Sequence, residues 1–419
     1  MAKTTRASPW ILGFTFAGIY LVNFFLAWPT TRWGDISNGS YLFGDFAWLS
    51  AWSTECRVNV AFPHLFSVYS QIDSSSTCPG FNYGMTLIIL LSIFPVAFEY
   101  YIIAALTVGL LAVFVLGYFL ASNYSMSFWQ KVLVSLAFFS PGTYLLFERG
   151  NLDIVIFLLI VMAAALLVRG SFLPSFFVLV LAALLKFYAF PLVVLVSLLS
   201  SNLRQRLVTT VFTLLTFTWI LVDLGRGPIL PVYGPVQFGY PVLDHYFEWL
   251  GLSLQPLPSL IGFLVPWFVW ALLVLIERRA GEGWQTKLTN SVAVLRGDYG
   301  FIFTSITFCA MFFVGLSFDY RLIFLALAGV ALILKNSFGR QVKFALWVSL
   351  FISLWGSGAF GGNFMFIPPA IKPLLVGGFQ LAGDLAVFLW VGILLYVVAL
   401  VIAKKIDWFG KLLAFVTGA

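Results

Sequence analysis

A short polar segment, Arg149-Gly-Asn-Leu-Asp153, separates two long apolar stretches of the sequence. Because Glu148 precedes it, a guanidinium, an amide and two carboxylates follow one another within a few positions. Charged groups in so apolar a region are costly to bury and therefore indicate a pathway or a binding site. Arg149 can bind an anion through two parallel hydrogen bonds, or it can pair locally with Glu148 or Asp153. Both interpretations stay open.

Asp45 is a second residue with possible chemistry. It precedes Phe46, Leu49 and Trp52, whose spacing is helical, so its side chain could cap a helix on the membrane surface. Such a cap contributes about 1 kcal/mol. Alternatively, partial desolvation at the lipid–water boundary raises the basicity of the carboxylate and suits it to general-base catalysis. The residue type alone favours the cap.

The composition decides which class of protein must position these residues. Hydrophobic residues make up 61% of the 419 residues and charged residues only 9%, whereas soluble domains contain roughly 25% charged residues. We therefore expect an all-α, polytopic helical membrane protein with a single integral-membrane domain over 1–419. Within it, a core over 1–200 is completed by more variable helices over 201–419. The net charge of +7 is interpreted as a topology signal and not as a nucleic-acid surface.

Basic residues in short loops predict the orientation, because cytoplasmic loops are enriched in Lys and Arg. Lys3 and Arg6 place the N-terminus in the cytoplasm, and Lys404 and Lys405 place the C-terminus there as well. The resulting prediction is about 11–13 membrane segments. These are expected at about 8–29, 99–121, 132–147, 151–168, 172–200, 207–224, 257–276, 299–317, 321–334, 344–357 and 380–402, with 84–97 as a juxtamembrane or re-entrant piece. The external loops are then 30–83, 225–256, 317–321 and 358–379.

The stretch 172–200 needs a special solution, since Arg169 and Arg204 at its two ends are both expected in the cytoplasm. It must enter the membrane and return, with a bend between Lys186 and Pro191. A broken helix is tolerated only where protein or a wet cavity satisfies its free backbone groups. Lys186 is therefore expected to face a cavity near the outer leaflet. The alternative is one tilted helix with a proline kink.

The first external loop, 30–83, contains two cysteines. A disulfide between Cys56 and Cys78 is expected there, because this side of the membrane is oxidising; the alternative is two unpaired thiols. The two histidines, His64 and His245, lie far apart in the sequence, so no metal site is expected. A divalent metal has no support in the residues.

The loop 225–256 is rich in Gly, Pro and aromatic residues, which can stack on sugar rings. Within it, His245 lies between Asp244 and Glu248 and is suited to proton transfer or hydrogen bonding. The alternative is a belt of interfacial aromatic residues with a surface histidine.

The order of these motifs resembles that of the integral-membrane GT-C glycosyltransferases, which use polyprenyl- or dolichyl-phosphate sugars. RGNLD at 149–153 is similar to the RGN-x-E signature of the GPI mannosyltransferase catalytic subunit. ALLKFYAFPLV at 183–193 resembles a K-x-YP stretch of that family and of bacterial polyprenyl-phosphate-mannose-dependent transferases. Asp45 matches their first-loop aspartate best, and FNYGMTL at 81–87 stands where they have Y-x-P. The likeness covers 1–200 and, more faintly, 318–325.

The resemblance implies a glycosyltransferase that moves one sugar, with mannose as the first expectation, from a polyprenyl-phosphate donor to a glycan or glycolipid acceptor. The reaction would occur on the outer, periplasmic or lumenal face of a membrane, here expected to be the bacterial cytoplasmic membrane. No cofactor is required. Asp45 would act as the base, and Lys186, Arg149 and Arg321 would bind the departing phosphate. The expected site-lining residues are Asp35, Glu55, Tyr83, Glu148, Asn151, Asp153, Tyr188, His245, Asp319 and Tyr320.

Three other possibilities stay open. A membrane carrier or a lipid-linked sugar flippase would also place cations in a membrane cavity, although its polar path should cross both leaflets. A non-catalytic subunit of a glycosylation complex would keep the fold. Arg321 also has two structural alternatives, a bond to Asp319 or extension of its side chain to the interface.

The orientation is testable by cysteine-accessibility labelling. A cysteine at Ser37 should react with an impermeant reagent added from outside, because the basic loops place 30–83 there. A cysteine at Gln285 should react only after the membrane is permeabilised. The reverse pattern would contradict the predicted topology.

Overall fold

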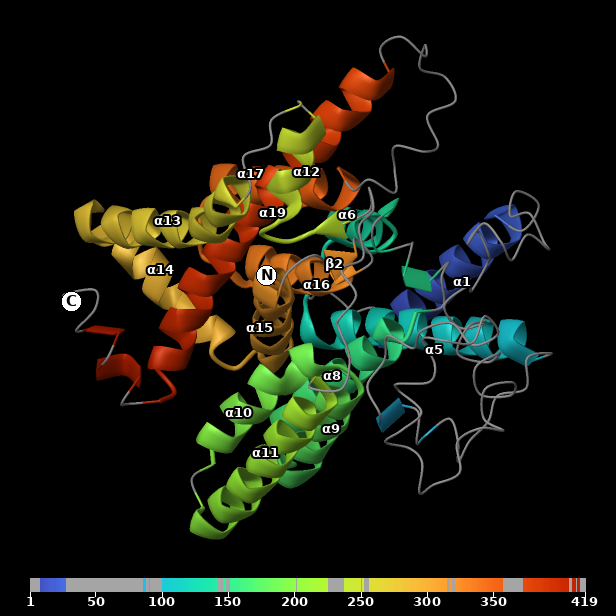
Figure 1. Ribbon diagram of the computed structural model, residues 1–419, viewed down its shortest axis with the longest axis vertical. Coiled ribbons are helices and arrows are strands. Elements are labelled where there is room, and N and C mark those ends of the chain that lie inside the picture. Colours follow the sequence, from blue (N-terminus) through green and yellow to red (C-terminus); the bar gives the residue numbers. More distant parts are fainter. Residues whose placement is uncertain are drawn as a thin grey trace.

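The structure is a computed structural model of the chain, and the regular elements among its described residues are helices and one two-stranded sheet (Figure 1). It describes residues 8–27, 86–87, 90, 100–141, 143, 146–147, 151–200, 202–224, 237–249, 251, 256–314, 317–318, 321–356, 372–406, 409–411 and 413–414. Within these residues there are 14 α-helices and one 3₁₀ helix. The all-α prediction is therefore confirmed for the described part of the chain.

The elements have the following bounds. The α-helices are α1 (Pro9–Ala27), α5 (Tyr101–Asn123), α6 (Phe128–Phe138), α8 (Asp153–Val168), α9 (Phe172–Leu185), α10 (Phe190–Leu198), α11 (Leu203–Leu224), α12 (Val242–Trp249), α13 (Leu257–Arg279), α14 (Glu282–Leu295), α15 (Tyr299–Val314), α16 (Leu322–Lys335), α17 (Arg340–Trp355) and α19 (Lys372–Ala403). The 3₁₀ helix η7 is Phe187–Ala189, and strands β1 (Gln237–Phe238) and β2 (Ser317–Phe318) pair antiparallel.

Four described segments are long and apolar enough to cross a membrane: Ile102–Asn123, Leu203–Leu224, Leu257–Arg279 and Gly377–Ala403. In the second and third, only 17% and 11% of the apolar window is buried inside the protein. Helices that are apolar all round and yet exposed need lipid around them. A multi-pass membrane protein follows from these helices.

The other apolar helices are shorter than the roughly 20 residues that a span needs. Several of them, including α8, α9 and α16, have 14 to 16 residues. They lie where crossings are expected from the sequence, but their length alone does not make them spans. The total of 11–13 segments therefore stays a prediction, and most of 84–97 lies outside the described residues.

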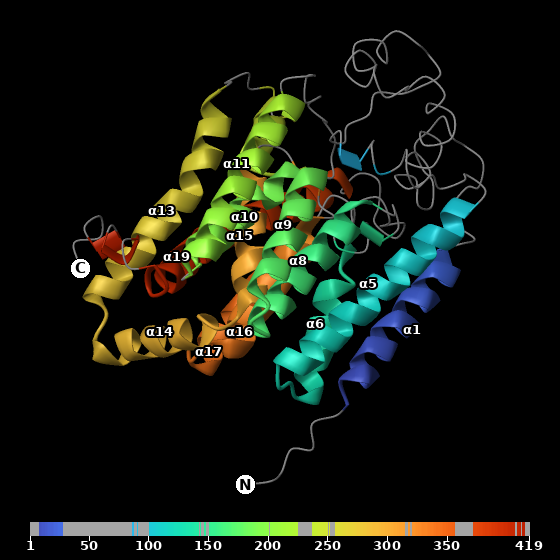
Figure 2. The same cartoon turned by 90° about the horizontal axis from the view of Figure 1, so that it is seen from below.

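Helices α1 and α5 lie side by side and pack very closely (Figures 1 and 2). A Cβ added at Gly117 of α5 would lie 2.7 Å from the backbone oxygen of Leu12 and 2.9 Å from the Cα of Gly13 in α1. Small residues at such a crossing let two backbones approach, which is how helices gain packing energy in lipid. Gly117 is thus needed because any side chain there would collide with α1, and not because the backbone adopts an unusual conformation.

Helices α8, α9, α10 and α11 form a second group of neighbours. The hydroxyl of Ser175 in α9 donates to the backbone oxygen of Ala163 in α8 at 2.7 Å. Helix α9 ends at Leu185, Lys186 adopts an extended backbone, and α10 begins at Phe190 and packs against α9. The helix is therefore broken at Lys186, as the sequence predicts, with Pro191 in the first turn of α10.

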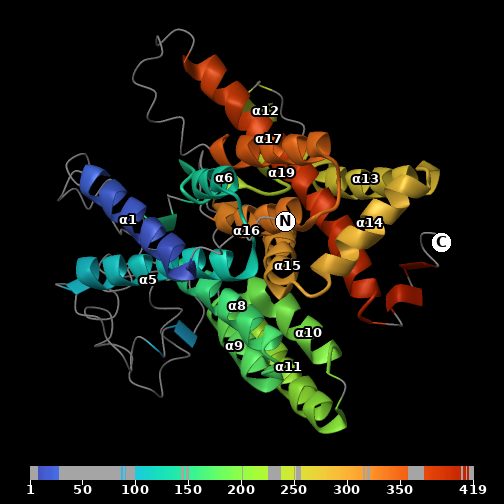
Figure 3. The ribbon, with the colours of Figure 1, turned by 180° about the vertical axis from the view of Figure 1, so that it is seen from behind.

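Helices α14 and α15 form a bent pair with an angle of 98° between them. The sequence assigns 278–296 to a basic cytoplasmic cluster, but most of it forms the helix α14. Figure 2 shows α14 lying across one end of the bundle, and Figure 3 shows it between α13 and α15. Its buried residues are spaced at helical intervals on one side: Leu288, Ser291, Val292 and Leu295.

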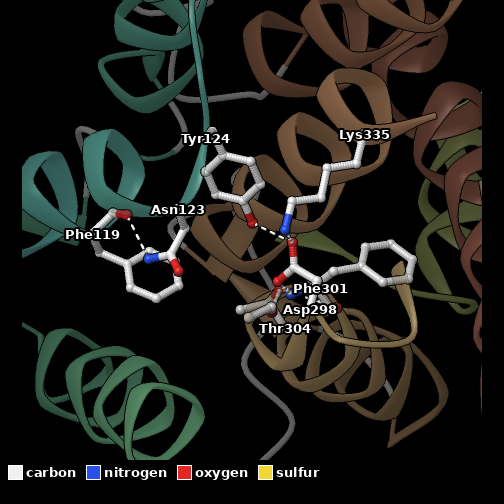
Figure 4. Close-up of polar contacts among 8 residues, drawn as sticks. Phe119, Asn123, Tyr124, Asp298, Phe301, Thr304 and Lys335 are labelled. Carbon is white, nitrogen blue, oxygen red and sulfur yellow. Dashed lines mark hydrogen bonds and ion pairs between the residues drawn. The ribbon is translucent and has the colours of Figure 1, made fainter. Parts of the chain in front are cut away.

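A buried ion pair holds the corner between α14 and α15 (Figure 4). Asp298 accepts hydrogen bonds from the backbone N–H of Phe301 at 2.9 Å and from the hydroxyl of Tyr124 at 2.8 Å. The ammonium of Lys335 lies 2.7 Å from the same carboxylate. Burial, reinforced by the nearby Asp298 carboxylate, raises the pKa of Tyr124 well above its ordinary value, so its hydroxyl stays a donor. The ends of α5 and α16 are thereby fixed to the start of α15.

Breaking this pair should destabilise the fold. Lys335→Met leaves the Asp298 carboxylate buried without its cation, and removing one partner of a buried pair typically costs about 3–5 kcal/mol. The double variant Asp298→Asn/Lys335→Met should lose less, because no uncompensated charge remains. Apparent melting temperatures of the purified variants in detergent measure both. Equal loss in the single and double variants would contradict this account.

Candidate functional site

Three segments far apart in the sequence meet at the carboxylate of Asp153. Asp153 is the first residue of α8 and is completely buried. Lys186 stands between α9 and η7, and Arg321 directly precedes α16. Each residue lies at the end or start of an apolar helix, and the three charges meet where these helix ends come together. We call Asp153, Lys186, Tyr188 and Arg321 the Asp153 cluster.

The contacts within the cluster differ in strength. Nε of Arg321 donates to Oδ2 of Asp153 at 2.9 Å, which is a charge-assisted hydrogen bond. Nζ of Lys186 lies 3.7 Å from Oδ1, close enough for an ion pair but too long for a hydrogen bond. Of these two contacts with Asp153, that of Arg321 is the stronger.

Two uncharged side chains, those of Tyr188 and Asn151, also contact Asp153. The hydroxyl of Tyr188 donates to Oδ1 of Asp153, and the guanidinium of Arg321 lies 5.5 Å from the centre of the Tyr188 ring. The Asn151 side-chain oxygen accepts the backbone N–H of Asp153 at 2.9 Å. Asn151 therefore shapes the turn that starts α8, and Tyr188 supports both charges.

Within the described residues, two cations face one carboxylate in the cluster. The carboxylate has no exposed surface, whereas 13% of the Lys186 side chain and 16% of the Arg321 side chain are exposed. Solvent or a ligand therefore meets the cations and not the acid. This arrangement is suited to binding an anion such as a phosphate.

The structure brings together four of the residues expected at the site, namely Asp153, Lys186, Tyr188 and Arg321, with Asn151 beside them. Arg321 binds Asp153 in the structure, whereas Asp319, the partner in one of its two structural alternatives, lies outside the described residues. The other expected residues lie outside the described residues: Asp35, Asp45, Cys56, Glu55, Cys78, Tyr83, Glu148, Arg149, Asp319 and Tyr320. The disulfide prediction is therefore not tested.

His245 lies in α12, a short helix held against two neighbours. Oδ1 of Asp244 accepts the backbone N–H of Ser259 at 3.0 Å, and its other oxygen accepts the Ser259 hydroxyl. The hydroxyl of Tyr246 donates to Asp384 of α19 at 2.5 Å. These contacts fix the helix that carries His245 to α13 and α19.

Strand β1, just before α12, pairs with β2. Gln237 faces Phe318, only a few residues before Arg321. The loop expected to cover an acceptor is therefore connected through this small sheet to the segment that leads into the Asp153 cluster.

Sequence reasoning missed two buried carboxylates. Asp298 and Asp384 are 5% and 6% exposed, and both accept hydrogen bonds from tyrosines. Asp298 immediately precedes an apolar helix, which is a signal for a helix cap. Asp384 lies inside a long apolar helix, where an isolated carboxylate indicates a partner. Within the described residues no group of three or more His, Cys, Asp or Glu side chains could hold a metal.

Comparison of the chain with protein-family models, with curated proteins and with solved structures finds no match. The functional argument must therefore rest on the residues and contacts described above. The likeness to GT-C enzymes stays a hypothesis from short motifs.

The unequal contacts generate a prediction. Arg321→Met removes a charge-assisted hydrogen bond, worth about 1.5–3 kcal/mol, from a buried carboxylate. Lys186→Met removes the longer, 3.7 Å ion pair to the same carboxylate. Arg321→Met should therefore lower the apparent melting temperature more than Lys186→Met does. The opposite ranking would show that the 2.9 Å contact does not dominate the cluster.

Proposed function

We propose that this protein is a GT-C-type glycosyltransferase that transfers one sugar, with mannose as the first candidate, from a polyprenyl-phosphate donor to a glycan or glycolipid. The observation that carries the proposal is the Asp153 cluster. Two cations expected to bind the donor phosphate, Lys186 and Arg321, share one buried carboxylate and retain exposed surface. The motif order of the sequence supplies the reaction type.

The chemistry requires a base and an anion site. The acceptor hydroxyl attacks the anomeric carbon and gives its proton to the base. A bond from the acceptor oxygen to that carbon forms as the bond from carbon to the phosphate oxygen breaks. Polyprenyl phosphate leaves with the electron pair, and the configuration inverts. Cations beside the leaving phosphate stabilise the developing charge.

Asp153 is assigned a positioning role and not that of the base. Its carboxylate is buried and already engaged by Lys186, Arg321 and Tyr188, so it cannot take a proton from an acceptor in solution. It instead holds the two cations at one place, and Arg149 would add a third. The base is assigned to Asp45, in the part of the chain outside the described residues, on the strength of the motif order.

The proposed orientation puts the Asp153 cluster at the outer face of 11–13 membrane segments. Arg321 and Lys335 stand at opposite ends of α16, a helix of 14 residues, or about 21 Å at 1.5 Å per residue. Basic residues also lie at neighbouring helix ends, since α13 ends with Arg278 and Arg279 and α17 begins at Arg340. The positive-inside rule favours the cytoplasm for that end.

The test uses purified protein and a panel of radiolabelled polyprenyl-phosphate sugars. Lys186→Gln should slow transfer by about 10- to 100-fold, equivalent to one lost charge-assisted contact to the phosphate. Lys405→Gln is the matched control, because Lys405 also lies against a tyrosine, 2.9 Å from the hydroxyl of Tyr299. Its rate should stay near that of the unchanged protein. Asp45→Asn should abolish transfer while donor binding persists.

Three results would contradict the proposal. Wild-type rates in Asp45→Asn would exclude that residue as the base. Equal losses in Lys186→Gln and Lys405→Gln would reduce the cluster to a structural role. Donor binding without transfer, accompanied by movement of the lipid-linked sugar across vesicle membranes, would favour a flippase.

A further inference from the structure

A cavity of about 300 Å³ lies at the end of the molecule where α14 and the start of α17 meet. This volume is at the lower end of the roughly 300–1,000 Å³ of small-molecule sites. Its walls include Trp284 and Lys287 from α14, Phe338 from the α16–α17 connection, and Arg340 from the first turn of α17. Two helices thus contribute one cation each to the same small space.

Both cations are exposed and available to a ligand. Lys287 and Arg340 form no ion pair with a carboxylate in the described part of the chain. No acidic residue is among the described residues that line the cavity. Two like charges that line one space repel each other, and an anion bound between them relieves this repulsion. The cavity is therefore complementary to an anionic group.

The walls of the cavity also suit a membrane surface. The rings of Trp284 and Phe338 lie 4.6 Å apart, and tryptophan is enriched at the lipid–water boundary. Because α14 meets the apolar helix α15 at 98°, α14 lies along the membrane plane if α15 crosses it. Figure 2 shows α14 and α17 at the same end of the bundle. The cavity then opens at the depth of lipid headgroups.

We propose that this cavity binds the phosphate-containing headgroup of an anionic phospholipid. Lys287 and Arg340 contact the phosphate, and the Trp284 and Phe338 rings contact the glycerol and the upper acyl chain. Basic pockets between membrane helices on the cytoplasmic side recognise lipid headgroups by the same chemistry. The proposal is independent of the glycosyltransferase assignment, since it uses none of the residues of the Asp153 cluster.

The experiment titrates phosphatidylglycerol into the full-length detergent-solubilised protein and counts bound lipids by native mass spectrometry. Lys287→Gln/Arg340→Gln should weaken the tightest binding step by about 10- to 30-fold, the scale expected for two cations near an anionic surface. Lys287→Arg/Arg340→Lys, which keeps both charges, should retain binding. The matched control is Arg169→Gln/Arg204→Gln, because both arginines are exposed and expected on the same side.

The control should bind like the unchanged protein. Unchanged affinity in Lys287→Gln/Arg340→Gln, or an equal loss in the control, would overturn the proposal. Phosphatidylcholine should not occupy the tight step, and equal affinity for it would also overturn the assignment. Displacement of the lipid by millimolar inorganic phosphate would identify a site for a soluble anion instead.

Discussion

The carboxylate of Asp153 has no contact with solvent, and an ion in that position must be neutralised by the protein itself. This requirement explains why α8, the break after α9 and the start of α16 converge. Helix propensity alone does not decide where these three helices begin or end, because all three are strongly apolar. Their ends are fixed where the charges meet.

Two ion-pair clusters in the described part of the chain differ in how many cations surround the carboxylate. Asp298 is compensated by one cation, Lys335, with Tyr124 and a backbone N–H as neutral donors, so its charges balance. Asp153 faces two cations among the described residues, and both side chains keep some exposed surface. The second cation distinguishes the Asp153 cluster from the Asp298 ion pair.

Apolar runs in the sequence predict the helices well, because a segment such as 153–168 has few ways to avoid being one. The break at Lys186 was also predictable from a lone charge followed by Pro191. Helix α14 was not predictable in this way, because its polar composition suggests a loop. In the structure it is a helix that packs one side against its neighbours. The partners of Asp153 could not be predicted either. Local spacing points to Arg149, and nothing local points to a residue as distant as Arg321.

That separation has a consequence for biosynthesis. Arg321 follows Asp153 by 168 residues, so at 5–20 residues per second a ribosome needs about 10–30 s to make the one after the other. For most of this interval the nascent chain already contains Asp153 and Lys186 but not the guanidinium that makes the shorter contact. The half-built bundle must keep its carboxylate hydrated or weakly paired until α16 arrives. The late helix therefore acts as the closing step of assembly, and a ribosome that stalls before it leaves a protein in which Asp153 lacks its 2.9 Å contact with Arg321.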